Sequence, residues 1–129
     1  MPFTYVIDAE RRLVHITASG RITASEAFSC FDEVASSPEF VQGMRVLSDH
    51  RQLDTTVSVG FVRMFLTKIN ALSELLRGSK LALVEAGAAR YGMARMASML
   101  SDPSVMELRA FRDFDEAKEW LEVDLEEES

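Results

Sequence analysis

The feature that most limits the fold is a short apolar run, Lys80 to Val84, which is hydrophobic at every position after the lysine. A strand with one wet face would alternate with polar residues, so this run predicts a strand covered on both faces. A long helix is expected before it, over 57–77, with Gly78 at its C′ position. A second helix is expected after it, over 89–100. A buried strand between two helices predicts parallel pairing in an α/β sheet.

The N-terminal part predicts a hairpin and a first helix. Segments 4–8 and 13–19 are short and β-branched and are separated by polar residues, as in an antiparallel pair. Thr23 and Glu26 then form the pattern of a capping box, and the helix that they begin ends before Pro38. Its apolar positions recur at helical spacing, so one face is expected to pack on a sheet.

The remaining segments complete the order of elements. A brief strand over 45–48 is expected to close in Asp49-His50-Arg51, and the last strand is expected over 105–111. Asp113 is placed as the N-cap of a final helix. The predicted fold is therefore α/β, an N-terminal β-hairpin followed by α-β-α-β-α-β-α, with a mixed five-stranded sheet flanked by helices.

Length and charge restrict the function classes. A chain of 129 residues predicts one domain, over 1–123, followed by an acidic tail over 124–129. The formal net charge of -7 opposes binding to nucleic acid, where cations must replace counterions. The single cysteine, Cys30, and the lack of an export signal or of about 18 consecutive apolar residues favour a cytoplasmic protein without a membrane span.

Five groups of residues support a family resemblance. They are Tyr5-Val6-Ile7-Asp8, Ser19-Gly20 with Ile22-Thr23, Val46-Leu47-Ser48-Asp49 with Arg51, Tyr91-Gly92-Met93-Ala94-Arg95-Met96, and Phe111-Arg112-Asp113 with Glu116-Ala117 and Trp120-Leu121. Together they span nearly the whole chain, which resembles the SpoIIAA-like proteins related to STAS domains, named for sulphate transporters and anti-sigma-factor antagonists. The resemblance implies the fold and a role in binding partner proteins, nucleotides or apolar ligands.

The resemblance also implies a phosphorylation switch, because the antagonist branch carries one at an aspartate followed by Ser or Thr. Asp54, Thr55 and Thr56 occupy the matching place, although Val57 stands where that branch usually has glycine and the loop before Asp54 looks shortened. The residues themselves suggest that a helix begins here, with Thr55, Thr56 and Ser58 at its start. The N-terminus of a helix would tolerate a phosphate on these hydroxyl groups. The alternative is that Asp54, Thr55 or Thr56 only caps the helix.

Ligands in open α/β sheets usually bind beyond the carboxyl ends of the parallel strands. The loops after Ser48 and Val84 are therefore the expected sites. The candidate rim contains the residues Asp49, His50, Arg51, Asp54, Thr55, Thr56, Ser58, Arg90, Tyr91 and Arg95. Arg90 and Arg95 could receive an anion, or Arg90 could pair with Asp49 or Glu85 as a local bridge.

Three functions are compatible with these patterns. The first is a non-enzymatic STAS-like regulatory or binding domain that acts through a protein partner or as a dimer. The second is a carrier of a small apolar or lipid-like ligand, held between the helix over 57–77 and the Met-rich helix over 89–100 with its polar head at Arg90 or Arg95. Both helix faces could instead simply fill the core. The third is a small hydrolase or transferase in which Asp49 orients His50. No catalytic residue, metal ligand or cofactor site is assigned.

Overall fold

The computed structural model describes residues 2–123, and the predicted acidic tail over 124–129 lies outside them. Its centre is one five-stranded sheet in the order β1-β2-β3-β4-β5. The strands are β1 Phe3–Asp8, β2 Leu13–Gly20, β3 Arg45–Leu53, β4 Ser79–Val84 and β5 Met106–Phe111. β1 pairs antiparallel with β2, and every other neighbouring pair is parallel. The mixed five-stranded sheet predicted from the sequence is confirmed.

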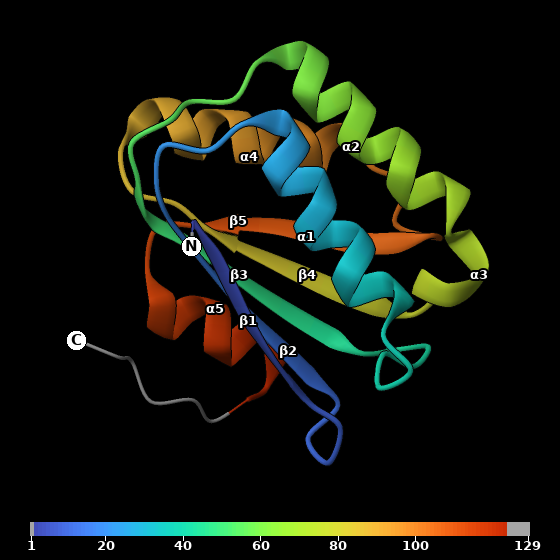
Figure 1. The fold of residues 1–129 in the computed structure, drawn as a ribbon. Helices are drawn as coiled ribbons and strands as arrows, with labels where there is room; N and C mark the ends of the chain where they lie inside the picture. The colour runs from blue at the N-terminus through green and yellow to red at the C-terminus, as the bar shows by residue number, and fades with distance from the viewer. Residues whose placement is uncertain (1, 124–129) are drawn as a thin grey trace.

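Helices cover both faces of the sheet (Figure 1). They are α1 Ala24–Ser36, α2 Val59–Ala71, α3 Ser73–Leu76, α4 Ala88–Leu100 and α5 Phe114–Leu121. α1, α2 and α4 lie on one face, and α5 lies on the other, against β3, β4 and β5. The predicted capping box of α1 is present, since the Thr23 side chain accepts a hydrogen bond from the Glu26 backbone and the Glu26 carboxylate accepts one from the Thr23 backbone.

The structure differs in two ways from the single helix predicted over 57–77. The helix begins at Val59, and Ser58 caps it by accepting a hydrogen bond from the Phe61 backbone at 3.1 Å. The prediction that Asp54, Thr55 or Thr56 caps this helix is therefore wrong. The helix is also interrupted at Leu72, where the backbone leaves helical geometry, so α3 is a separate single turn.

Strand β3 is longer than the sequence predicts, because its polar half also pairs with a neighbour. Asp49, His50 and Arg51 lie within the strand, which continues to Leu53. Beyond an irregularity between Thr17 and Ser19, the end of β2 pairs with residues 52 and 53. The loop that looks shortened in the sequence is therefore strand.

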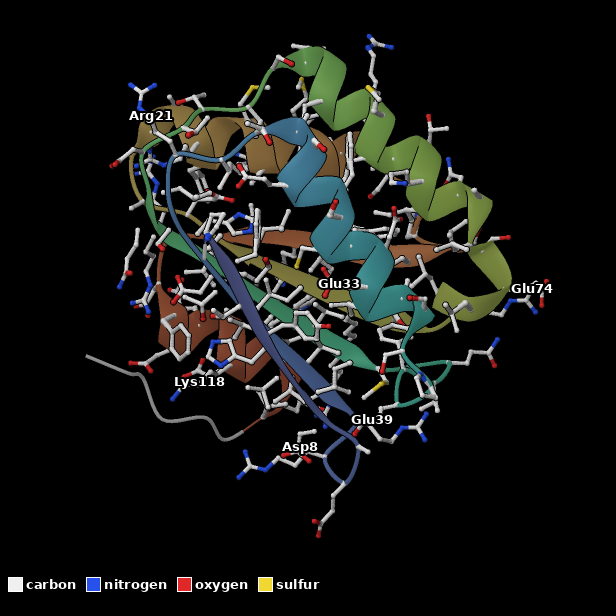
Figure 2. All side chains as sticks on the ribbon, viewed as in Figure 1. Asp8, Arg21, Glu33, Glu39, Glu74 and Lys118 are labelled. Carbon is white, nitrogen blue, oxygen red and sulfur yellow. The ribbon has the colours of Figure 1, made fainter. Side chains whose placement is uncertain are left out.

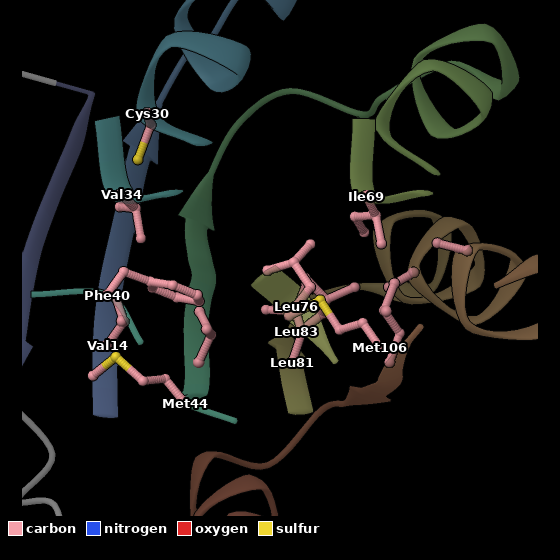
Figure 3. Packing of buried hydrophobic residues seen from close by; sticks show 14 of the residues in the cluster. Val14, Cys30, Val34, Phe40, Met44, Ile69, Leu76, Leu81, Leu83 and Met106 are labelled. Atoms are coloured by element: carbon pink, nitrogen blue, oxygen red, sulfur yellow. The ribbon is translucent and has the colours of Figure 1, made fainter. Parts of the chain in front are cut away.

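Side-chain alternation along the strands divides the core into two layers. Val46, Leu81 and Leu83 point toward α1, α2 and α4, whereas Leu47, Ala82 and Val84 point toward α5. In the larger layer, Figure 3 shows Cys30 and Val34 of α1 on the β2 side and Ile69 of α2 on the β4 side. β4 is thus buried on both faces, as its apolar run predicts.

Charged side chains are concentrated on the outer surface, as Arg21 and Glu74 illustrate (Figure 2). No helix within residues 2–123 combines the length and the apolar composition that crossing a membrane requires.

Candidate functional site

A cavity of about 150 Å³ lies between the sheet and the layer of α1, α2 and α4. Most of its wall is hydrophobic, from side chains such as Phe31, Phe61 and Met93. The oxygen- and nitrogen-bearing side chains in the wall are Ser48, His50, Thr55, Glu85 and Arg90. Because all five lie at or beyond the carboxyl-terminal parts of β3 and β4, the cavity has one polar end.

Ser48 and His50 meet at this end because they are two residues apart on one strand. Successive side chains of a strand point to opposite faces, so residues 48 and 50 share the face that points into the cavity. The Ser48 Oγ lies 2.6 Å from His50 Nε2. Ser48 is buried, whereas about 19% of the His50 side chain is exposed, so the polar end reaches the surface at His50.

Glu85 holds the other nitrogen of the same imidazole. The residue follows β4 directly, and its backbone N–H donates to the Phe111 carbonyl at 2.8 Å, which ties it to the end of β5. Its buried carboxylate then places Oε2 2.6 Å from His50 Nδ1. Two neighbouring strands therefore fix a continuous hydrogen-bonded chain from Ser48 through His50 to Glu85.

The direction of these hydrogen bonds follows from the chemistry of the groups. A carboxylate in its ionised form can only accept, and with Glu85 in that form His50 Nδ1 carries the proton of this hydrogen bond. In a neutral imidazole, Nε2 is then an acceptor, and the Ser48 hydroxyl donates to it. This is the arrangement in which a histidine can remove the proton from a serine hydroxyl.

Asp49, which the sequence suggested as the partner of His50, points to the other face of the sheet. Its carboxylate accepts from the Arg51 guanidinium at 2.9 and 2.8 Å, and the guanidinium lies 4.7 Å from the ring centre of Phe114 in α5. Burial would raise the pKa of Asp49, but the hydrogen bonds and charge of Arg51 outweigh it, so this pKa lies below its ordinary value. The predicted pairing of Asp49 with His50 is wrong, and Glu85 takes its place.

The residues of the suggested switch precede α2 in a segment that is neither helix nor strand. The Thr55 hydroxyl lines the cavity and accepts a hydrogen bond from the Ile22 backbone at 3.1 Å, which links this segment to the chain before α1. Asp54, Thr56 and Ser58 are exposed. Ser58 is thus the residue at the helix start, and Thr55 and Thr56 lie before it.

The arginines and the tyrosine of the rim are divided between two places. Arg90 lines the cavity, and its Nε donates to the Ala86 carbonyl at 3.1 Å. The carboxylates suggested as its partners bond elsewhere, Asp49 to Arg51 and Glu85 to His50. Tyr91 and Arg95 line a separate hollow beside β5, where the Arg112 guanidinium lies 4.6 Å from the Tyr91 ring centre.

Reasoning from the sequence did not assign Ser48 or Glu85 to the site. The available signal was the Ser-x-His spacing, which puts both side chains on one face once the strand extends through residue 50. Glu85 follows the adjacent parallel strand, so its position beside that strand end could also be inferred. Within residues 2–123, no three His, Cys, Asp or Glu side chains are grouped so that they could hold a metal ion.

Comparison with known proteins identifies the architecture. No protein-family model matches the sequence, and no curated protein matches it either. The structure is similar to that of an uncharacterized protein from the DUF3478 family with a SpoIIAA-like fold, from Shewanella loihica PV-4, with a TM-score of 0.61. The two chains are 18% identical over 92% of this chain and 93% of the other. The chain therefore has a SpoIIAA-like fold, as the sequence resemblance predicts.

Proposed function

We propose that the chain is a binding domain for a small, mostly apolar molecule that carries one hydrogen-bonding head group. The supporting observation is the cavity itself, with its hydrophobic wall and its single polar end at Ser48, His50 and Glu85. Pockets that bind small molecules combine apolar walls with a few fixed polar groups that orient the ligand. The polar end suits such a ligand because its groups are already hydrogen-bonded to one another and need little rearrangement.

The size of the cavity restricts the ligand. An engineered cavity of about 150 Å³ in another protein stays dry and binds benzene. The cavity here has the same volume, so a ring or a short branched chain with one polar group matches it. Arg90 offers N–H donors at the polar end, and a carbonyl oxygen is a head group that they can bind.

Titration calorimetry with acetophenone and ethylbenzene tests this proposal, because the two molecules are nearly equal in size and only the first has a carbonyl. Acetophenone should bind about two- to tenfold more tightly, since one net hydrogen bond contributes about 0.5–1.5 kcal/mol. Failure of both compounds to bind to the folded chain would contradict the proposal.

Filling the cavity should remove this binding. Ala94 of α4 is buried in the wall, so Ala94→Leu puts three further carbon atoms in the ligand space. Displacing ligand carbons whose burial contributes about 0.8 kcal/mol each should weaken acetophenone binding by about tenfold or more. Met99→Leu is the matched control, since Met99 lies on the same helix with 75% of its surface exposed. Equal affinities in the two variants would place the ligand outside the cavity.

A role in protein binding, with phosphorylation of the segment over 54–58, is a second proposal. Thr56 and Ser58 are exposed there, and Thr55 lines the cavity next to them. Ligand occupancy and a partner could therefore affect the same segment. Acidic substitution of Thr56 that changes the self-association or partner binding of the chain would support this role, and unchanged binding would argue against it.

A further inference from the structure

We infer that Ser48 is a nucleophile and that the cavity is the acyl-binding site of a small esterase, an inference that rests on the proposed binding function. The observation is the chain Ser48 Oγ···His50 Nε2 and His50 Nδ1···Glu85 Oε2, with both distances 2.6 Å. A nucleophile bonded to a base that a third group orients is the geometric signature of covalent acyl transfer. The apolar cavity beside Ser48 gives that chemistry a place for its substrate.

Each member of the chain has a distinct task. Ser48 and His50 would contact the reacting atoms, and both side chains line the cavity. Glu85 is a positioning residue, because its carboxylate contacts His50 Nδ1 and keeps the acceptor nitrogen facing Ser48. Arg90 supplies N–H donors in the same wall for the carbonyl oxygen on which negative charge develops.

The reaction balances with water as the only co-reactant. Ser48 Oγ forms a bond to the carbonyl carbon of an ester, and its proton passes to His50 Nε2. The ester C–O bond then breaks, and the leaving alkoxide takes that proton and departs as an alcohol. Water next attacks the acyl carbon and gives a proton to Nε2, the bond from the acyl carbon to Oγ breaks, and Oγ regains the proton. The products are a carboxylic acid and an alcohol, with no change of oxidation state.

Labelling with diisopropyl fluorophosphate tests the nucleophile directly. In this reaction, Ser48 Oγ forms a bond to phosphorus, fluoride leaves, and the hydroxyl proton passes through His50 to solvent. Peptide mass spectrometry of the full chain should find the diisopropylphosphoryl group on Ser48. The adduct should be absent in Ser48→Ala and present in Ser79→Ala, a matched control in which a buried strand serine outside the cavity wall is replaced.

The role of Glu85 is tested by exchanging one carboxylate oxygen for an amide nitrogen in the variant Glu85→Gln. The new side-chain amide can donate to His50 Nδ1, which would place the ring proton on Nε2 and remove the acceptor that Ser48 needs. With p-nitrophenyl butyrate as substrate, Glu85→Gln should lower kcat by about 10²- to 10⁴-fold while KM changes little. Asp49→Asn is the control, because Asp49 is a carboxylate on the opposite face, and its kcat should equal that of the wild type.

Two results would overturn the inference: no label on Ser48 in folded wild-type chain, or labelling and turnover that stay unchanged in Glu85→Gln. Neither depends on whether a variant folds poorly, since the first uses the wild type and the second requires activity to persist. Acetophenone binding without labelling would leave the binding proposal in place and remove only the esterase. Labelling of Ser48 without acetophenone binding would instead contradict the binding proposal.

Discussion

Replacing Phe114 by alanine should destabilise the fold by about 3–5 kcal/mol, the usual loss for a large aromatic side chain removed from a core. Phe114 begins α5 and exposes only 3% of its surface. Its ring lies 4.7 Å from the Arg51 guanidinium and 6.0 Å from the His15 ring, so it joins the helix to β3 and β2. Among the described residues α5 is the only helix on that face, and the cavity left behind has no second helix to close over it.

Urea unfolding of the Phe114→Ala variant measures this loss. Val6→Ala is the control, because Val6 lies in a strand but is 66% exposed, and its replacement should change the free energy of unfolding by no more than about 0.5 kcal/mol. A loss below about 1 kcal/mol in Phe114→Ala would mean that α5 does not pack on the sheet as described.

The thiol of Cys30 should react with 5,5′-dithiobis(2-nitrobenzoate) about two orders of magnitude more slowly in the native chain than in the urea-unfolded chain at mildly alkaline pH. The thiol is buried in the cavity wall, and burial, with a smaller contribution from the charge of Glu33, raises the pKa of Cys30 to about 11. Only the thiolate attacks the reagent, so a raised pKa reduces the reactive fraction, and burial restricts access further.

A second cysteine provides the control for that experiment. Ser29 precedes Cys30 on α1 and is exposed, so Ser29→Cys should add one thiol that reacts at an ordinary rate while the slow phase of Cys30 persists. Rapid reaction of Cys30 in the wild type would show that the cavity wall admits a charged aromatic reagent. That result would contradict a shielded apolar site.

The element order could be predicted because local patterns and the fold agree. The apolar run of β4, the capping box of α1 and the Asp113 cap of α5 each indicate the structure that is present. The length of β3 could not be read in this way, because Asp49-His50-Arg51 looks like a turn when taken alone. It is strand because Asp49 pairs with β2 and β4 and the residues that follow, 52 and 53, pair again with the end of β2, which is a tertiary effect.

The candidate site was predicted only in part, because its residues are brought together by the tertiary structure. The sequence directed attention to the carboxyl ends of the parallel strands, and His50, Thr55 and Arg90 do lie together on one cavity there. Which carboxylate faces His50 depends on strand register and side-chain direction. Asp49 is adjacent in sequence but points away, whereas Glu85 is 35 positions distant and lies within 2.6 Å. Proximity along the chain therefore suggested the wrong partner.

The most direct test of the ligand cavity is a titration of the isotopically labelled chain with acetophenone, followed by nuclear magnetic resonance. The methyl signals of Ala94 and Ala97 and the ring signals of His50 should shift and saturate together, since all three residues line the cavity. Ala117 and His15 provide controls within the same sample, because they lie on the α5 side of the sheet. Their signals should stay in place. Saturating shifts at Ala117 and His15, or none at Ala94, Ala97 and His50, would contradict binding of the ligand in this cavity.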